Sequence, residues 1–153
     1  MANPDSVSQY YLDSFGNGRI GSAQAVSLST VANATVAIPL LNGGLTNSGN
    51  VVGSGAVILR RITVNNPSGS LSSANVSITT SNDGNTSNAV VAVTNLANLT
   101  AAGKYQDLTI ASPYSTSSAI TGNVTQSLFV NVSAASGNTN VASFQVYGDV
   151  VQF

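Results

Sequence analysis

The chain of 153 residues contains four Lys or Arg, five acidic residues, all of them Asp, and no His, Cys, Trp or Glu, while Ser, Thr and Asn make up about a third of it. General acid–base catalysis, thiol nucleophiles and transition-metal sites draw mainly on His, Cys and Glu, so the composition argues against most reaction classes. We therefore expect no enzyme activity and no cofactor or metal. With a net charge of −1 and no basic cluster beyond Arg60-Arg61, direct binding of nucleic acid is not expected.

The length is typical of a single domain, and a hydrophobic fraction of 42% with a mean hydropathy of +0.22 is typical of a folded chain. No apolar stretch approaches the about 18 residues that a membrane-spanning helix needs, so no membrane partner is expected. The first residues, Met1–Asp5, lack the charged and apolar regions of a secretion signal. This predicts synthesis in the cytoplasm.

Residues 1–23 are predicted to form an N-terminal arm. Within it, Asp5 or Ser6 can cap a short helix that carries Tyr10 and Tyr11 on one side. Exposed aromatic side chains are unfavourable in water, so we expect the arm to dock either on its own domain or on a neighbouring copy.

Residues 24–153 are predicted to form one β-sandwich domain. Short β-forming runs recur about every ten residues between Gly, Asn, Ser and Pro, a spacing typical of all-β sandwiches. Antiparallel strands joined by both short turns and longer connections favour two sheets, most simply an eight-stranded jelly roll. The eight predicted strands are 24–30, 34–41, 55–65, 74–80, 89–94, 105–111, 126–133 and 141–152.

Glycine and proline indicate how the strands end. The segment Ser81–Asn85 contains Asp-Gly and predicts a tight reversal, because Gly readily adopts a positive φ angle. A second turn is predicted at Ser136–Thr139, and Gly148 predicts a bulge in the last strand. Pro39 is expected at a sheet edge or strand end, because it lacks an N–H.

The third predicted strand carries two adjacent arginines. Because side chains alternate along a strand, Arg60 and Arg61 are predicted to point to opposite faces. Arg60 falls on the side of Ile58, Ile62 and Val64, and Arg61 on the side of Leu59 and Thr63. In so charge-poor a chain each guanidinium needs a partner, and the predicted partners are Asp107 and Asp149. The pairs are expected either within one subunit or across a subunit contact, where they would fix register more than add stability.

The aspartates of the sequence are poor candidates for a metal site or a catalytic pair. Asp83-Gly84-Asn85 has oxygen ligands and a sharp turn, but it lacks the further carboxylates of a calcium loop, so a structural turn is favoured. Asp107 and Asp149 are unsuited to an acid–base pair, because no His or Glu divides the two roles. We expect them to be paired with arginine or solvated.

Several phrases of the sequence resemble the small head decoration, or cement, proteins of tailed bacteriophages. The phrases are Arg60–Gly69, Ala74–Ile78, Lys104–Ile110 and Val146–Phe153. Such proteins bind the outside of the assembled shell, often as trimers, and hold neighbouring capsomers together. The resemblance implies a virion protein on the outer capsid surface, made in the host cytoplasm. Its implied partners are the major capsid protein and further copies of itself, as a homotrimer.

A nearly uncharged surface rich in Ser, Thr and Asn suits broad hydrogen-bonded contacts that salt weakens little. Aromatic and arginine side chains tend to concentrate the energy of such contacts. The candidate interface residues are therefore Tyr10, Tyr11, Phe15, Arg60, Arg61 and Phe153. Phe153 has the alternative role of closing the end of its own domain.

Three other functions remain open. A trimeric tail or fibre domain shares the β fold but is expected to have a longer N-terminal shaft. A carbohydrate-binding sandwich needs an aromatic platform, whereas this chain has no Trp and only five Tyr, which are scattered. A main shell-forming capsid protein is disfavoured by the short length.

Overall fold

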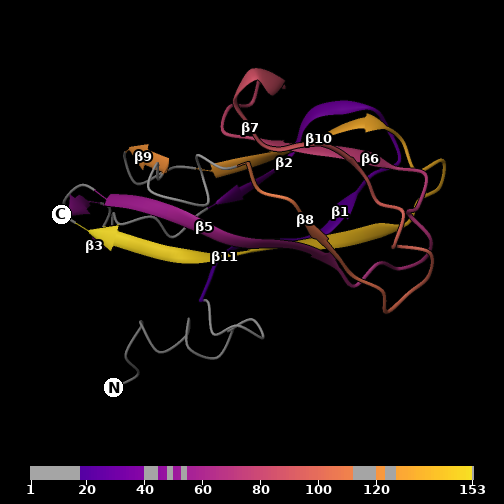
Figure 1. Ribbon diagram of the computed structural model, residues 1–153, viewed down its shortest axis with the longest axis horizontal. Coiled ribbons are helices and arrows are strands. Elements are labelled where there is room, and N and C mark those ends of the chain that lie inside the picture. The colour runs from indigo at the N-terminus through magenta and orange to yellow at the C-terminus, as the bar shows by residue number, and fades with distance from the viewer. Residues whose placement is uncertain are drawn as a thin grey trace.

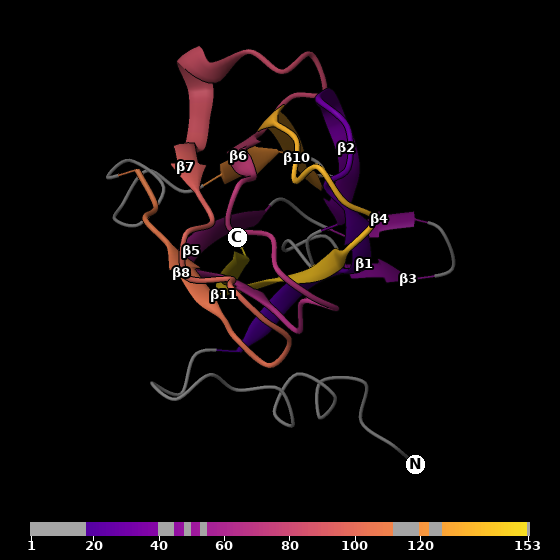
Figure 2. The same ribbon diagram turned by 90° about the vertical axis from the view of Figure 1, so that its right-hand side faces the viewer.

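The computed structural model describes residues 18–39, 45–47, 50–52, 55–111, 120–122 and 127–152. In this part of the chain, two antiparallel sheets pack face to face (Figure 1). Figure 2 shows the two sheets as an upper and a lower layer. The predicted all-β, two-sheet sandwich is therefore confirmed.

The larger sheet has the strand order β1-β11-β5-β8. Its strands are β1 (Arg19–Ser27), β11 (Val141–Gln152), β5 (Gly55–Asn65) and β8 (Gln106–Leu108). The short strand β9 (Ile120–Gly122) pairs with the beginning of β5. We call this layer the large sheet.

The second layer, the small sheet, has the order β2-β10-β6-β7. Its strands are β2 (Ala32–Pro39), β10 (Ser127–Ala134), β6 (Asn75–Thr79) and β7 (Ala89–Asn95). Two short strands, β3 (Leu45–Asn47) and β4 (Asn50–Val52), pair with each other. The 3-10 turn η1 (Thr86–Asn88) precedes β7.

Each of the eight predicted strands is present, with ends shifted by a few residues. The largest shift is in β1, which begins at Arg19 and not at Gln24. Residues 19–23 therefore lie in the large sheet and not in the predicted arm. Apolar and polar residues do not alternate clearly in this segment, and its extended conformation results from pairing with β11. Strands β3, β4 and β9 were not predicted, because a segment of three residues is too short to show an alternating pattern of apolar and polar residues.

The turns occur where the sequence predicts them. Gly84 has a φ of +70° between β6 and β7, and Gly137 has a φ of +74° between β10 and β11. Pro39 is the last residue of β2, at the edge of the small sheet. The pattern of Gly and Pro therefore located these strand ends correctly.

The hydrophobic core lies between the two sheets. Phe144 of β11 is the largest of the fully buried side chains. Removing such apolar area from water stabilises the fold by about 25 cal/mol per Å². Other fully buried residues come from both layers, among them Leu59, Ile62 and Val64 of β5, Val76 and Ile78 of β6, and Val130 of β10.

Candidate functional site

The side chains of β5 change direction at a β-bulge that contains Arg60. Leu59 pairs with Gly148 of β11, and Arg61 pairs with Tyr147, so two steps along β5 match one step along β11. Arg60 is the extra residue. A bulge of this kind interrupts the alternation of side chains and redirects those beside it.

The bulge corrects the predicted faces of β5. Leu59 is fully buried, on the same side as Ile62 and Val64, although the sequence predicts it on the opposite side. Arg60 was predicted to point to the core side and is exposed instead. The prediction was wrong because it assumed regular alternation. The bulge expected at Gly148 does occur at this level of the sheet, but its extra residue belongs to β5.

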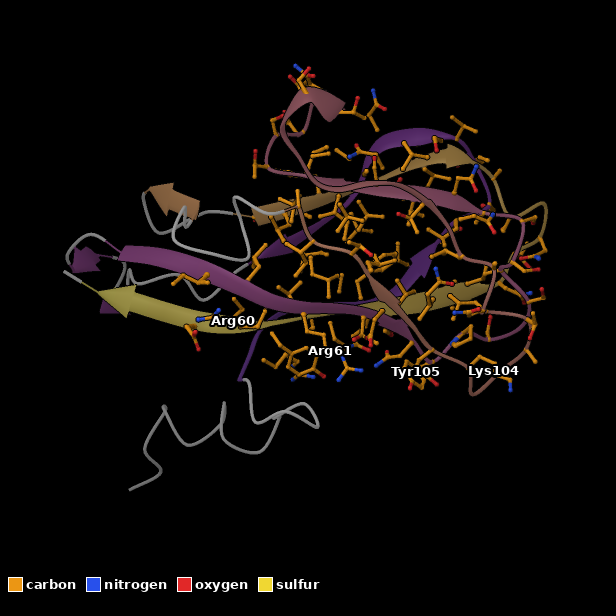
Figure 3. All side chains as sticks on the ribbon, viewed as in Figure 1. Arg60, Arg61, Lys104 and Tyr105 are labelled. Carbon is orange, nitrogen blue, oxygen red and sulfur yellow. The ribbon has the colours of Figure 1, made fainter. Side chains whose placement is uncertain are left out.

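Arg60 and Arg61 consequently both lie on the outer side of the large sheet, and Figure 3 shows them there. Arg60 binds Asp149 of β11: Nε and Nη2 both lie 2.8 Å from Oδ2. Both side chains are largely solvated, with 42% and 49% of their surface exposed. Such a pair in water contributes little to stability.

Arg61 is held more firmly, by Asp107 of β8. Its Nε lies 2.8 Å from Oδ1 and its Nη2 lies 2.9 Å from Oδ2, a two-pronged geometry. The hydroxyl of Thr63 also donates to Oδ1, at 2.6 Å. Only 19% of the Arg61 side chain is exposed. The predicted partners of both arginines are therefore confirmed, and both pairs form within one chain.

The third arginine lies on the same side of the sheet. Arg19 of β1 donates from Nη1 to Oε1 of Gln145 on β11, at 3.1 Å. Gln145 alternates along β11 with the core residue Phe144, which places it on the outer side. All three arginines of the chain thus gather on one side of one sheet.

The turn that leads into β8 adds two further side chains, Lys104 and Tyr105. Figure 3 shows both on the same side of the molecule as Arg60 and Arg61. Tyr105 is 61% exposed. Within the described part of the chain, neither side chain makes a hydrogen bond or ion pair. We call the outer side of the large sheet, with its three arginines and these two residues, the arginine face.

Sequence reasoning did not select Tyr105 or Lys104. The predicted strand 105–111 did contain a signal for the side on which Tyr105 lies, because alternate residues of a strand share a side, although its exposure could not be predicted. Asp107 was correctly paired with an arginine, so Tyr105, two residues earlier, belongs on the same side. The predicted interface residues Tyr10, Tyr11, Phe15 and Phe153 lie outside the described residues.

The charges of the molecule are distributed unevenly. The arginine face contains all four Lys and Arg residues of the chain: Figure 3 shows Arg60, Arg61 and Lys104, and the bond to Gln145 places Arg19. Among the described residues it contains two carboxylates, Asp107 and Asp149, which leaves an excess of two positive charges. The chain as a whole has a net charge of −1. Among the described residues the face is therefore positive, whereas the only charged side chain outside it is that of Asp83.

The remaining described carboxylate, Asp83, lies in the turn between β6 and β7 of the small sheet. Its Oδ1 accepts hydrogen bonds from the Ser81 hydroxyl at 2.5 Å and the Asn85 N–H at 2.9 Å. These bonds, the Ser81 hydroxyl first, hold the pKa of Asp83 below its ordinary value. The carboxylate of Asp83, which the sequence offers as a possible calcium ligand, thus stabilises the turn through hydrogen bonds.

The described residues contain no group of three or more acidic or other metal-ligating side chains. None of their helical segments has the length and apolar character to cross a bilayer.

By its fold and its candidate site, the chain is a two-sheet β-sandwich with an ion-paired arginine face on its large sheet. Comparison with protein-family models, with curated proteins and with solved structures finds no match to this chain. Its function must therefore be inferred from its own residues.

The two ion pairs are expected to differ in their contribution to stability. Asp107→Ala should lower the free energy of unfolding by about 1–2 kcal/mol, because Arg61 and Thr63 lose hydrogen bonds in a partly buried place. Asp149→Ala should cost less than about 0.5 kcal/mol, because that pair is solvated. Urea denaturation followed by circular dichroism measures both. Equal costs would contradict the assignment of Asp107 as the structural partner.

Proposed function

We propose that this protein is a structural virion protein that binds the outer surface of a bacteriophage capsid and holds neighbouring capsomers together. It acts by binding and not by catalysis. The arginine face is the proposed contact with the major capsid protein. Other copies of the chain are the second proposed partner, in a homotrimer.

One observation carries this proposal. Three of the four phrases that resemble phage decoration proteins, Arg60–Gly69, Lys104–Ile110 and Val146–Phe153, contribute to β5, β8 and β11. These three strands are neighbours in the large sheet. Phrases from distant parts of the sequence therefore contribute to one surface, the arginine face, which supports a shared binding role for them.

The order of the strands gives further support. Counting the eight strands of the two main layers in chain order, without β9, the large sheet runs first, eighth, third, sixth and the small sheet second, seventh, fourth, fifth. We interpret this order as the double Greek key of a jelly roll, an architecture of viral capsid and lectin domains. It suits a rigid module that presents one flat side to a partner.

The proposed mechanism is stabilisation by mass action. A subunit bound across a capsomer boundary stabilises the assembled shell by RT ln(1 + [L]/Kd), and the effect repeats at every site. The paired arginines hold their side chains in place before binding. Less conformational entropy is then lost when the face meets its partner.

The test uses undecorated heads of the phage that encodes the chain, prepared without this protein. Purified protein should cosediment with them to saturation and raise the temperature at which they release DNA. Heads that already carry the protein are the control and should bind no more. Failure to cosediment, together with binding to a glycan array, would overturn the proposal in favour of a sugar-binding module.

The oligomeric state is tested separately by light scattering coupled to size exclusion, at low and high salt. We expect a trimer at both salt concentrations, because the surface outside the arginine face contains few charges. A monomer at both concentrations would contradict the homotrimer.

A further inference from the structure

The cations of the arginine face fall into two kinds. Arg60 and Arg61 each have a carboxylate partner in the chain, and Arg19 bonds to an amide oxygen. The ammonium group of Lys104 has no partner within the described residues, and the same holds for the hydroxyl of the 61% exposed Tyr105. No described residue therefore occupies the donors of Lys104 and Tyr105, and we take them to be open to an external group.

The two residues also have the properties of interface anchors. Tyrosine offers a large ring with few rotatable bonds and a polar tip, and it is enriched among the residues that dominate binding energies. Lysine supplies three donors and no acceptor, so its natural partner is a carboxylate or another anion. The excess of two positive charges among the described residues of the face adds attraction for a negative surface.

We propose that the arginine face docks on a carboxylate-bearing protein surface, with Lys104 and Tyr105 as its anchors. The Lys104 ammonium pairs with a carboxylate of the partner, and the Tyr105 ring packs beside it. In Figure 3, Arg61 lies between Tyr105 and Arg60, so the solvated Arg60–Asp149 pair extends the face beyond this contact. The proposal rests on the proposed function, because the partner is taken to be the shell protein.

The carboxylates of the face favour a protein over a nucleic acid as the partner. Asp107 and Asp149 lie among the cations and would repel the uniformly negative phosphates of DNA. Affinity for DNA comes mainly from several cations that neutralise phosphates. A protein surface, in contrast, presents both carboxylates and hydrogen-bond donors, which suits a face of mixed sign.

The first experiment tests the face without a capsid. Wild-type protein is applied at pH 7 and low salt to a carboxymethyl surface, with immobilised double-stranded DNA as the second probe. Despite its net charge of −1, it should be retained by the carboxymethyl surface. Lys104→Gln should elute at lower salt. The matched control is Ser87→Asp, which changes the net charge equally at an exposed position in η1, before the small-sheet strand β7.

Elution of Lys104→Gln at lower salt than the wild type, with Ser87→Asp eluting at the wild-type salt concentration, supports docking through the arginine face. No retention, or equal shifts for both variants, would overturn it. Tighter retention on DNA than on the carboxymethyl surface would overturn the choice of a protein partner.

The second experiment measures binding to undecorated heads. Lys104→Gln and Tyr105→Ala should each weaken binding about tenfold or more, as expected for anchor residues. Their thermal stability should equal that of the wild type, because neither side chain has a bond to lose within the described residues. Wild-type binding that neither variant weakens overturns the inference and leaves the proposed function intact. If the wild type does not bind heads but the carboxymethyl result holds, the proposed function fails and the acidic-surface preference stands.

Discussion

Gly148→Ala is expected to lower the free energy of unfolding by at least about 2 kcal/mol. An added Cβ would lie 2.2 Å from the backbone oxygen of Ile58, and backbone atoms cannot rotate away as a side chain can. The Gly148 N–H also donates to the Gly18 oxygen at 2.9 Å, so β1, β5 and β11 are all tied at this level. The variant should therefore also disturb the bulge that places Arg60 and Arg61 on one side.

Gly18→Ala is the matched control for this prediction. It lies at the other end of the same hydrogen bond, and an added Cβ there meets no heavy atom within 4 Å. Its free energy of unfolding should change by less than about 0.5 kcal/mol. Thermal and urea unfolding followed by circular dichroism compare the two variants. If both variants were equally stable, the close approach of Gly148 to the Ile58 backbone would not limit the residue at position 148.

Asn131→Ala is the second variant expected to have a large effect, a loss of about 3 kcal/mol. The Asn131 side chain is buried at the centre of the small sheet, with the residue only 4% exposed. Its Oδ1 accepts from the N–H of Ala34 at 2.7 Å, and its Nδ2 donates to the hydroxyl of Thr79 at 2.9 Å. Ala34 has a φ of +48°, an uncommon conformation that this hydrogen bond helps to hold. Alanine would leave a cavity and an unpaired Ala34 N–H, while the Thr79 hydroxyl would keep only its bond to the Ser81 oxygen, at 2.7 Å.

Asn95→Ala provides the comparison for this variant. Asn95 is exposed, and its Nδ2 donates to Asn75 at 2.7 Å and to the oxygen of Ala74 at 3.2 Å. Because water can replace both bonds, the loss should stay below about 1 kcal/mol. Urea denaturation measures both variants. A similar loss for both would mean that burial does not set the contribution of Asn131.

Some features of the arginine face could be predicted from the sequence and others could not. Pairing of Arg60 and Arg61 with Asp107 and Asp149 was predictable, because a charge-poor chain offers its cations few partners. That both arginines share one side of the sheet was not. It depends on a single extra residue in β5, which becomes visible only when the register against β11 is known. The exposure of Tyr105 likewise depends on what the neighbouring strands leave uncovered.

Local sequence patterns were enough to predict the fold class, most strand positions and the turns. The reason is that alternation and positive-φ glycines act over a few neighbouring residues, as at Gly84 and Gly137. Tertiary structure alone decided the start of β1, the bulge at Arg60 and the gathering of all cations on one face. These features arise from pairing between segments far apart in the chain, and no local pattern encodes which register such segments adopt.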